Sequence, residues 1–206
     1  MPTISTIPQT VNVDDETIEI SPEGKIRVKD GGIISAKIKN AEITPEKLSF
    51  GTMEKIIEYV VPSNTNSITL NNIPPIYSTF CLITQMSNSG LTPVYLRFNN
   101  DTGTNYDYVG FNTSGTAIYE HSGSGDSIYY FTSNIDPHFA ITWITNHSSL
   151  NKNVLIIARA LISSSGRRIV TFGRWLNTNS KITSITFFAT TNFVANQTRF
   201  VLYGVR

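Results

Sequence analysis

Five acidic side chains after position 58 are the first candidates for chemistry: Asp101, Asp107, Glu120, Asp126 and Asp136. A glycoside hydrolase needs two carboxylates that face one cleft, one acting as the acid and the other as base or nucleophile. All five stand among residues typical of turns, where acidic side chains usually stabilise the turn itself. A polysaccharide-degrading enzyme is therefore a remote alternative, and we predict no catalytic residue and no enzymatic activity.

One of these segments has the oxygen pattern of a calcium loop. The sequence DTGTNYD places oxygen atoms at alternate positions, on Asp101, the Gly103 carbonyl, Asn105 and Asp107, and Ca²⁺ binds several such ligands at once. The bidentate Glu that closes an EF-hand is missing. A polar hairpin between the strands around Tyr95 and Tyr108 explains the same residues. We favour the hairpin and predict no metal site and no cofactor, while the calcium interpretation stays open.

Aromatic side chains gather between positions 106 and 130 and form the candidate ligand-binding set. Tyrosine beside Ser, Gly and Asn is typical of adaptable recognition loops, and a glycine-rich loop is predicted within this stretch, at Ser122–Gly125. The alternative is that the rings fill the core and rim of a β-sandwich. The two interpretations are equally supported by the sequence. The set comprises Tyr106, Tyr108, Tyr119, Tyr129 and Tyr130, with His121 among them.

The elements that must position these residues are β-strands. From Glu54 onward the chain alternates short segments rich in Ile, Val, Thr and aromatics with gaps of Asn, Gly, Ser or Pro, which predicts antiparallel sheets. The final strand is expected to lie inside a sheet. An all-β, antiparallel sandwich of the jelly-roll type over residues 53–206 accommodates this many strands. The predicted strands are 55–61, 66–70, 77–86, 93–99, 105–111, 115–119, 127–133, 139–145, 153–161, 168–175, 182–189 and 199–205.

The N-terminal quarter has a different pattern. Residues 1–15, with Pro2 and Pro8, are predicted to be an extended arm. Residues 16–52 are predicted to be an oligomerising β stem, with strands at 17–20 and 25–29 on either side of a turn. Its apolar residues recur every five positions and cannot bury themselves within one chain. Copies from other subunits are the favoured cover, and a flexible linker is the alternative. These apolar residues are Ile33, Ile38, Ile43 and Leu48.

Composition excludes several classes of protein. Only 15% of residues are charged and the net charge is +1, so the basic face of a general nucleic-acid binder is missing. The lone Cys81 excludes an intramolecular disulfide framework and a cysteine zinc cluster. Apolar runs such as Val154–Ala158 are too short to span a bilayer, so we expect no membrane insertion, and the first ten residues do not resemble a secretory signal. Charged residues are concentrated in residues 1–58, which hold 17 of the 31.

Two parts of the chain, one N-terminal and one in the β-rich remainder, resemble virion structural proteins of bacterial and archaeal viruses. The segment ISPEGKIRVKDGGIISAKIKNAEITPEKL is similar to their fibre-like stems, which usually trimerise. The segments YLRFNNDTGTNYDYV, ITSITFFATTNF and RFVLYGV are similar to a β-sandwich head found in tail fibres, spikes, turrets and capsid decoration proteins. The head motif usually carries glycine where Asn100 and Asn196 stand here. Asparagine tolerates left-handed backbone angles better than most residues, so the same turns remain available.

The resemblance implies a non-enzymatic, homo-oligomeric virion protein, anchored by its N-terminal region and projecting a β-sandwich head. A trimer is favoured and a pentamer is the main rival. Expected partners are sister subunits, capsid or tail components and a host surface glycan, but not nucleic acid. The protein would be assembled in the host cytoplasm and reside in the extracellular particle. The alternative function is a host-receptor or carbohydrate-binding adhesin that uses the tyrosine set.

Overall fold

The computed structural model describes residues 18–20, 25–28, 53–114, 116–133, 136–160 and 167–206. The chain divides into two compact units, residues 1–49 and 50–206. In the first unit, β1 (Ile18–Ile20) pairs antiparallel with β2 (Ile26–Val28), as the alternating pattern predicts. The arm and the stem residues Ile33, Ile38, Ile43 and Leu48 lie outside the described residues, so the stem remains a prediction.

The second unit, called the head below, is built from twelve strands. Each overlaps one of the twelve predicted segments. The all-β, antiparallel prediction is therefore confirmed for the described residues, which contain no helix and hence none able to cross a membrane. The strands are β3 (Met53–Val60), β4 (Thr65–Leu70), β5 (Thr79–Met86), β6 (Thr92–Phe98), β7 (Tyr106–Ser114), β8 (Ala117–Gly125), β9 (Ile128–Ser133), β10 (His138–Thr145), β11 (Lys152–Ala160), β12 (Arg167–Trp175), β13 (Ile185–Phe193) and β14 (Arg199–Val205).

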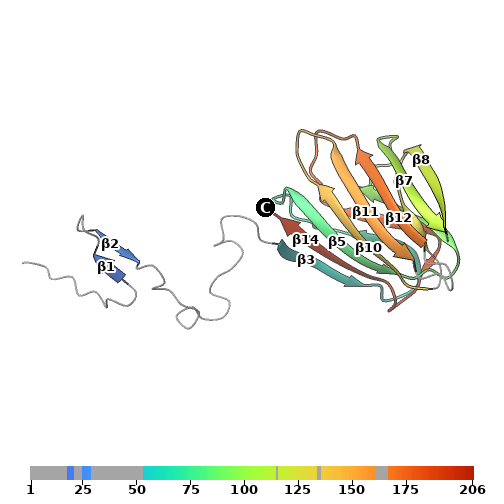
Figure 1. Cartoon of the computed structure of the whole chain (residues 1–206), viewed down its shortest axis with the longest axis horizontal. Helices are drawn as coiled ribbons and strands as arrows, with labels where there is room; N and C mark the ends of the chain where they lie inside the picture. Colours follow the sequence, from blue (N-terminus) through green and yellow to red (C-terminus); the bar gives the residue numbers. More distant parts are fainter. Residues whose placement is uncertain (1–17, 21–24, 29–52, 115, 134–135, 161–166) are drawn as a thin grey trace, which may run out of the picture. The chain divides into compact units, whose positions relative to one another are not determined.

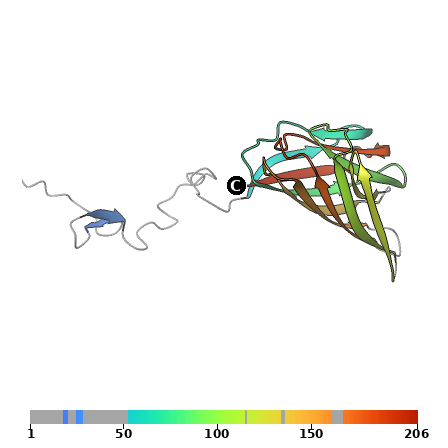
Figure 2. The same ribbon diagram turned by 90° about the horizontal axis from the view of Figure 1, so that it is seen from above.

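The strands form two antiparallel sheets that face each other. The large sheet has the order β3-β14-β5-β10-β11-β12-β7-β8, and the small sheet has the order β4-β13-β6-β9. Figure 1 shows the large sheet as a fan of labelled strands, and Figure 2 shows the small sheet lying against one of its faces. The last strand, β14, lies between β3 and β5, so the expectation that it is held inside a sheet is confirmed.

The core fills the space between the two sheets. Because side chains alternate along a strand, every second residue points inward, and these residues are large and apolar. Their burial removes most of the apolar surface of both inner faces from water, which is the main stabilising term. The largest fully buried apolar side chains include Trp175, Tyr106, Tyr130, Phe80, Phe98, Phe131, Phe187, Phe193 and Phe200.

Two local predictions need correction. The segment after β6 is not a hairpin, because β6 belongs to the small sheet and β7 to the large one, so the chain crosses between sheets there. Ser122–Gly125 is not a loop but the end of β8, paired with β7 from Tyr106 to Val109. Glycine and serine offer β8 small side chains that leave room for neighbouring rings.

Four asparagines adopt left-handed backbone angles. Asn100 has a φ of 53° and Asn196 a φ of 58°, so both occupy the conformation that glycine usually takes at these turns. Asn99 is stabilised further, because its Oδ1 accepts hydrogen bonds from the Thr183 and Ser184 amides at 2.8 and 3.1 Å. The asparagines therefore preserve the turns that join the strand ends.

Candidate functional site

The most unusual feature of the head is the outer face of the large sheet, which points away from the small sheet. Its central residues form two rows across six neighbouring strands, each residue directly opposite the next in the antiparallel register. We call these twelve side chains the apolar face. The first row is Val201, Ile83, Ile141, Ile157, Val170 and Phe111, and the second is Tyr203, Cys81, Trp143, Leu155, Phe172 and Val109.

Much of the apolar face is open to water. Ile157, Phe172 and Trp143 expose 51%, 50% and 40% of their surface, and Ile83, Val109, Phe111 and Ile141 are also exposed. The alternation of a sandwich strand normally puts polar side chains on the outer face. Monomeric soluble proteins rarely expose a contiguous apolar patch of this extent, and such patches mark binding surfaces.

Polar residues enclose the apolar face on all four sides. One end of the strands carries Arg199, Gln85, Phe139, Arg159 and Arg168, with Phe139 the one apolar member of this set. The other end carries Val205, Thr79, Thr145, Asn153, Arg174 and Asp107, with Val205 its one apolar member. At the sheet edges, Glu58 and Lys55 of β3 stand opposite the first residue of each row, while Glu120 and Ser122 of β8 stand opposite the last. An apolar centre with a polar rim is the anatomy of a protein interface.

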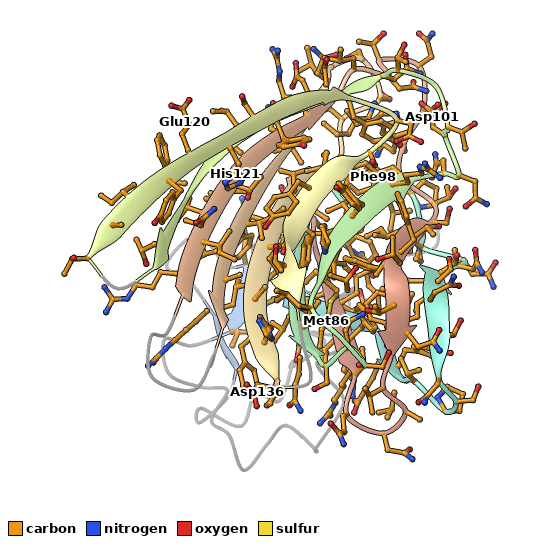
Figure 3. All side chains as sticks on the ribbon, turned by 90° about the vertical axis from the view of Figure 1, so that its right-hand side faces the viewer. Met86, Phe98, Asp101, Glu120, His121 and Asp136 are labelled. Atoms are coloured by element: carbon orange, nitrogen blue, oxygen red, sulfur yellow. The ribbon has the colours of Figure 1, made fainter. Side chains whose placement is uncertain are left out.

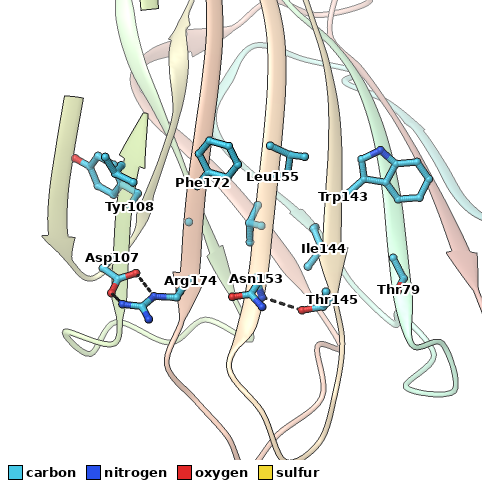
Figure 4. A pocket seen from close by; sticks show the side chains of 13 residues that line it. Thr79, Asp107, Tyr108, Trp143, Ile144, Thr145, Asn153, Leu155, Phe172 and Arg174 are labelled. Atoms are coloured by element: carbon cyan, nitrogen blue, oxygen red, sulfur yellow. Dashed lines mark hydrogen bonds and ion pairs between the residues drawn. The ribbon is translucent and has the colours of Figure 1, made fainter. Parts of the chain in front are cut away.

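Two shallow hollows lie on this face. One, of about 630 Å³, is lined by Trp143, Leu155 and Phe172, with Arg174 and Asp107 at its polar end; Figure 4 shows the three apolar side chains across neighbouring strands. Arg174 Nε donates to Asp107 Oδ1 at 2.9 Å, which fixes that end. The other hollow, of about 660 Å³, is lined by Ile83, Phe139, Ile141, Ile157, Arg159, Arg168 and Val170.

The outer face of the small sheet is different. Thr69 and Thr186 stand side by side with their hydroxyl oxygens 3.1 Å apart, and Thr186 also donates to Asn100 Oδ1 at 3.0 Å. Arg97 of β6 lies over the ring of Phe188 at 4.3 Å and pairs with Asp126. The same face carries one row of partly buried rings, in which Phe188 stacks on Tyr95 at 5.6 Å and Tyr95 meets Tyr129 edge to face. It is therefore less apolar and less exposed than the outer face of the large sheet.

The structure separates the predicted tyrosine set into two groups. Tyr106 and Tyr130 have no exposed surface, which corrects their assignment as ligand-binding residues, because a ligand at the surface cannot reach them. Tyr106 donates to the Phe98 carbonyl, and the Tyr130 hydroxyl lies 2.7 Å from Thr142 Oγ1. Burial raises the pKa of Tyr130 to about 12, although hydrogen bonds to Thr142 and Thr84 oppose the shift.

Of the other three tyrosines, Tyr108 lies on β7 and Tyr119 on β8 of the large sheet, and Tyr129 lies on β9 at the edge of the small sheet. The ring of Tyr129 lies 6.0 Å from that of Tyr108 and 4.7 Å from that of His121, and Tyr119 is 54% exposed. His121 Nε2 is 3.0 Å from Thr171 Oγ1, and burial lowers the pKa of His121. The binding role of Tyr108, Tyr119 and Tyr129 therefore remains a prediction, and the ring contacts of Tyr108 and Tyr129 and the exposure of Tyr119 are compatible with it.

The five candidate acids do not gather at one place on the head, although Asp101 and Asp126 both interact with Arg97. Figure 3 shows Asp101, Glu120 and Asp136 at three separate places. Asp101 accepts hydrogen bonds from Trp175 Nε1 at 2.7 Å, Asn105 Nδ2 at 2.9 Å and the Gly103 amide at 2.9 Å. Burial alone would raise the pKa of Asp101, but these donors outweigh it and lower the pKa. Asp101 is thus a structural residue that ties the loop after β6 to the end of β12.

The calcium interpretation of the Asp101–Asp107 loop finds no support in this geometry. Asp107 belongs to β7 and points to Arg174, while Asp101 is occupied by its three donors. No group of three or more His, Cys, Asp or Glu side chains that could hold a metal occurs among the described residues. Of the five acids, Asp107 alone lines either of the two hollows on the large sheet.

The apolar face was not predicted from the sequence, although a signal for it exists. The run Val154–Ala158, VLIIA, has no polar residue at alternate positions. A strand with one wet face alternates, whereas a near-continuous apolar run is typical of a strand covered on both faces. In this head the inner face of that run lies in the core and its outer face is left open, so the run has the composition of a doubly covered strand but is covered by the head on one side only.

Comparisons with protein-family models, with curated proteins and with solved structures gave no match for this chain.

Proposed function

We propose that this chain is a non-enzymatic structural protein that works as an assembly of identical copies. The observation that carries the proposal is the apolar face, two rows of apolar side chains of which the head leaves seven exposed and four half-buried, with Cys81 alone buried. Leaving such an area in water costs free energy in proportion to its apolar surface, on the order of 25 cal/mol per Å². Association removes that cost, so the head is suited to assembly.

The proposed setting is the surface of a virion, as a spike, fibre, turret or decoration protein. The support for this part is the resemblance of the stem and head segments to virion proteins. In this proposal residues 1–52 anchor the chain and hold sister subunits through Ile33, Ile38, Ile43 and Leu48, and the head is a jelly roll that projects outward. The strand content and the two facing sheets are compatible with that kind of head.

Measurement of mass in solution tests the assembly part of the proposal. We expect the full chain to be a stable oligomer at micromolar concentration, by light scattering after gel filtration and by sedimentation. A monomer under these conditions contradicts it. Antibody labelling of purified virus particles tests the setting: label on the particle surface supports it, and confinement of the chain to unassembled host extract contradicts it.

An adhesin that binds host glycans is the second candidate. The ring cluster of Tyr108, Tyr129 and His121, with the exposed Tyr119 two residues from His121 on β8, supports it, because aromatic rings with polar edges stack on sugars and donate hydrogen bonds. Binding to a glycan array that is lost in Tyr119→Ala would support this function. Binding that persists in Tyr119→Ala and Tyr129→Ala would exclude the cluster as its site.

A further inference from the structure

We infer that the apolar face packs against the same face of a second copy of this chain, about a two-fold axis. The inference rests on the proposed function, because it specifies how an assembly of copies is made. It goes further in naming the surface, the partner and the symmetry. The occupant could in principle be a ligand, a different protein or the same chain, and three features of the face favour the last.

The first feature is the chemistry of the surface. Eleven of its twelve side chains are hydrocarbon or aromatic, and the twelfth is Cys81. A glycan needs hydrogen-bonding groups spread over its site, because each buried hydroxyl requires a partner. Here polar groups stand mainly at the rim, around the two apolar rows. An extended surface of Ile, Val, Phe and Trp instead matches another such surface, as two sheets packed face to face do.

The second feature is size. The two apolar rows and the rim row on either side of them extend over six strands. With the usual strand spacing and rise per residue, these four rows measure about 29 by 27 Å. That is on the order of 800 Å², the area that each partner contributes to a stable interface of standard size. A small molecule in one of the two hollows would leave most of the rows uncovered. Only a partner of comparable extent covers both hollows at once.

The third feature is the lack of a second apolar surface for a head-to-tail contact. The outer face of the small sheet carries threonines, Arg97 and a single row of partly buried rings, Phe188, Tyr95 and Tyr129. Within the described head, no sheet face other than the outer face of the large sheet carries two exposed rows of apolar residues. A head-to-tail contact needs two different complementary surfaces, whereas a two-fold contact needs one surface that complements itself. The single apolar face therefore favours the two-fold arrangement.

The charges at the rim are consistent with self-complementarity. Arg159 and Arg168 stand opposite each other in the register, and Glu120 lies at the β8 edge. Within the part of the chain that the structure describes, none of the three has an ion-pair partner. Neighbouring like charges at a rim disfavour the isolated head and suit a partner that brings carboxylates. A second copy carries both signs.

A charge placed at the centre of the face tests the inference. The full chain with Ile157→Glu is compared with wild type and with Ser67→Glu, an exposed position on the small sheet. Because Ile157 is half exposed, a glutamate there leaves no cavity in the head. We expect an even-numbered wild-type oligomer, a fall to half that mass or less in Ile157→Glu, and no change in Ser67→Glu. We expect the dissociation constant of the face-to-face contact to be at least tenfold higher in Ile157→Glu than in wild type.

The outcomes separate this inference from the proposed function. A wild-type oligomer whose mass is the same in Ile157→Glu overturns the face contact but leaves an assembly of copies. A clean trimer that becomes a monomer in Ile157→Glu overturns the two-fold axis alone. A wild-type monomer overturns both the face contact and the proposed assembly of copies. If a glycan then binds and the binding is lost on substitution of Trp143, the apolar face is a sugar-binding surface instead. If circular dichroism shows that Ile157→Glu does not fold, Ile157→Thr decides by the same mass measurement.

Discussion

Ile141 of β10 and Ile157 of β11 stand directly opposite each other in the antiparallel register, and each exposes about half of its surface on the outside of the sandwich. Directly opposite side chains on one face of a sheet contact each other, so the pair forms the centre of the apolar face. On the inner face of the same strands, Ala140 and Ile156 are buried in the core. Both faces of these two strands are therefore apolar.

Tryptophan fluorescence reports whether the apolar face is covered. The chain has two tryptophans: Trp143 lies on the face, 40% exposed in the isolated head, and Trp175 is fully buried in the core. We predict that acrylamide quenches wild-type emission weakly, because both rings are shielded in the assembly. In Ile157→Glu one of the two rings becomes accessible and quenching rises. Equal quenching of wild type, Ile157→Glu and Ser67→Glu would contradict a covered face.

Replacement of Tyr130 by phenylalanine should destabilise the head without changing its shape. The Tyr130 hydroxyl lies 2.7 Å from Thr142 Oγ1 and 3.3 Å from Thr84 Oγ1, all of them buried. Its loss leaves two buried hydroxyls without that partner, which costs about 1–3 kcal/mol. Tyr129→Phe is the control, because its hydroxyl contacts Thr132 at a partly buried site. Denaturant unfolding measures both variants, and equal losses would contradict the difference in burial.

The strands were predictable from the sequence because their signal is local. Runs of β-branched and aromatic residues ended by Asn, Gly, Ser or Pro mark each strand without reference to its neighbours. The pairing is not local: β14 lies beside β3 and β5, from the other end of the head. For the same reason the segment after β6 was interpreted as a hairpin, although its two strands belong to different sheets.

The candidate site was only partly predictable, because the burial of a side chain depends on which face of the strand it occupies. Tyr129 and Tyr130 are adjacent in sequence, yet Tyr130 is in the core and Tyr129 lies among aromatic rings at the edge of the sandwich. A run such as YY carries no alternation that would fix this phase. The apolar face was missed for the same reason, since its strands are apolar at successive positions.

Gly110→Ala should be strongly destabilising. A Cβ added at Gly110 would lie 2.4 Å from the Val170 carbonyl oxygen and 2.5 Å from His121 Nε2. The carbonyl belongs to the paired strand β12 and cannot move without disturbing the sheet, so we predict a loss of about 1–3 kcal/mol or more. Gly125→Ala in the same hairpin is the matched control, since nothing lies within 4 Å of its added Cβ. Equal melting temperatures for the two variants would contradict this packing.

Asp101 should make stability depend on pH in the acid range. Its pKa in the folded protein is lowered by the donors Trp175, Asn105 and Gly103, against the opposing effect of burial. The unfolded chain therefore takes up the proton first, and the stabilisation present above about pH 3.9 is lost as the pH falls through the folded value. Asp101→Asn keeps an oxygen for Trp175 but removes the charge. We predict that its free energy of unfolding is about 1 kcal/mol lower than that of wild type at neutral pH, and that this difference becomes smaller as the pH falls. A difference that does not change with pH would contradict this role.

His121 should produce a second pH dependence, at higher pH than that of Asp101. Burial lowers its pKa from the ordinary value, since the charged ring would be partly removed from water beside Tyr108 and Tyr129. The unfolded chain binds the proton more tightly, so stability is complete above about pH 6.5 and falls as the pH drops below that value. The ring also contacts Thr171 through Nε2 at 3.0 Å, and His121→Gln offers an amide for that contact without a titrating group. We expect the free energy of unfolding of His121→Gln to decline less from pH 7 to 5 than that of wild type. Parallel curves for the two proteins over this interval would show that the decline has another source.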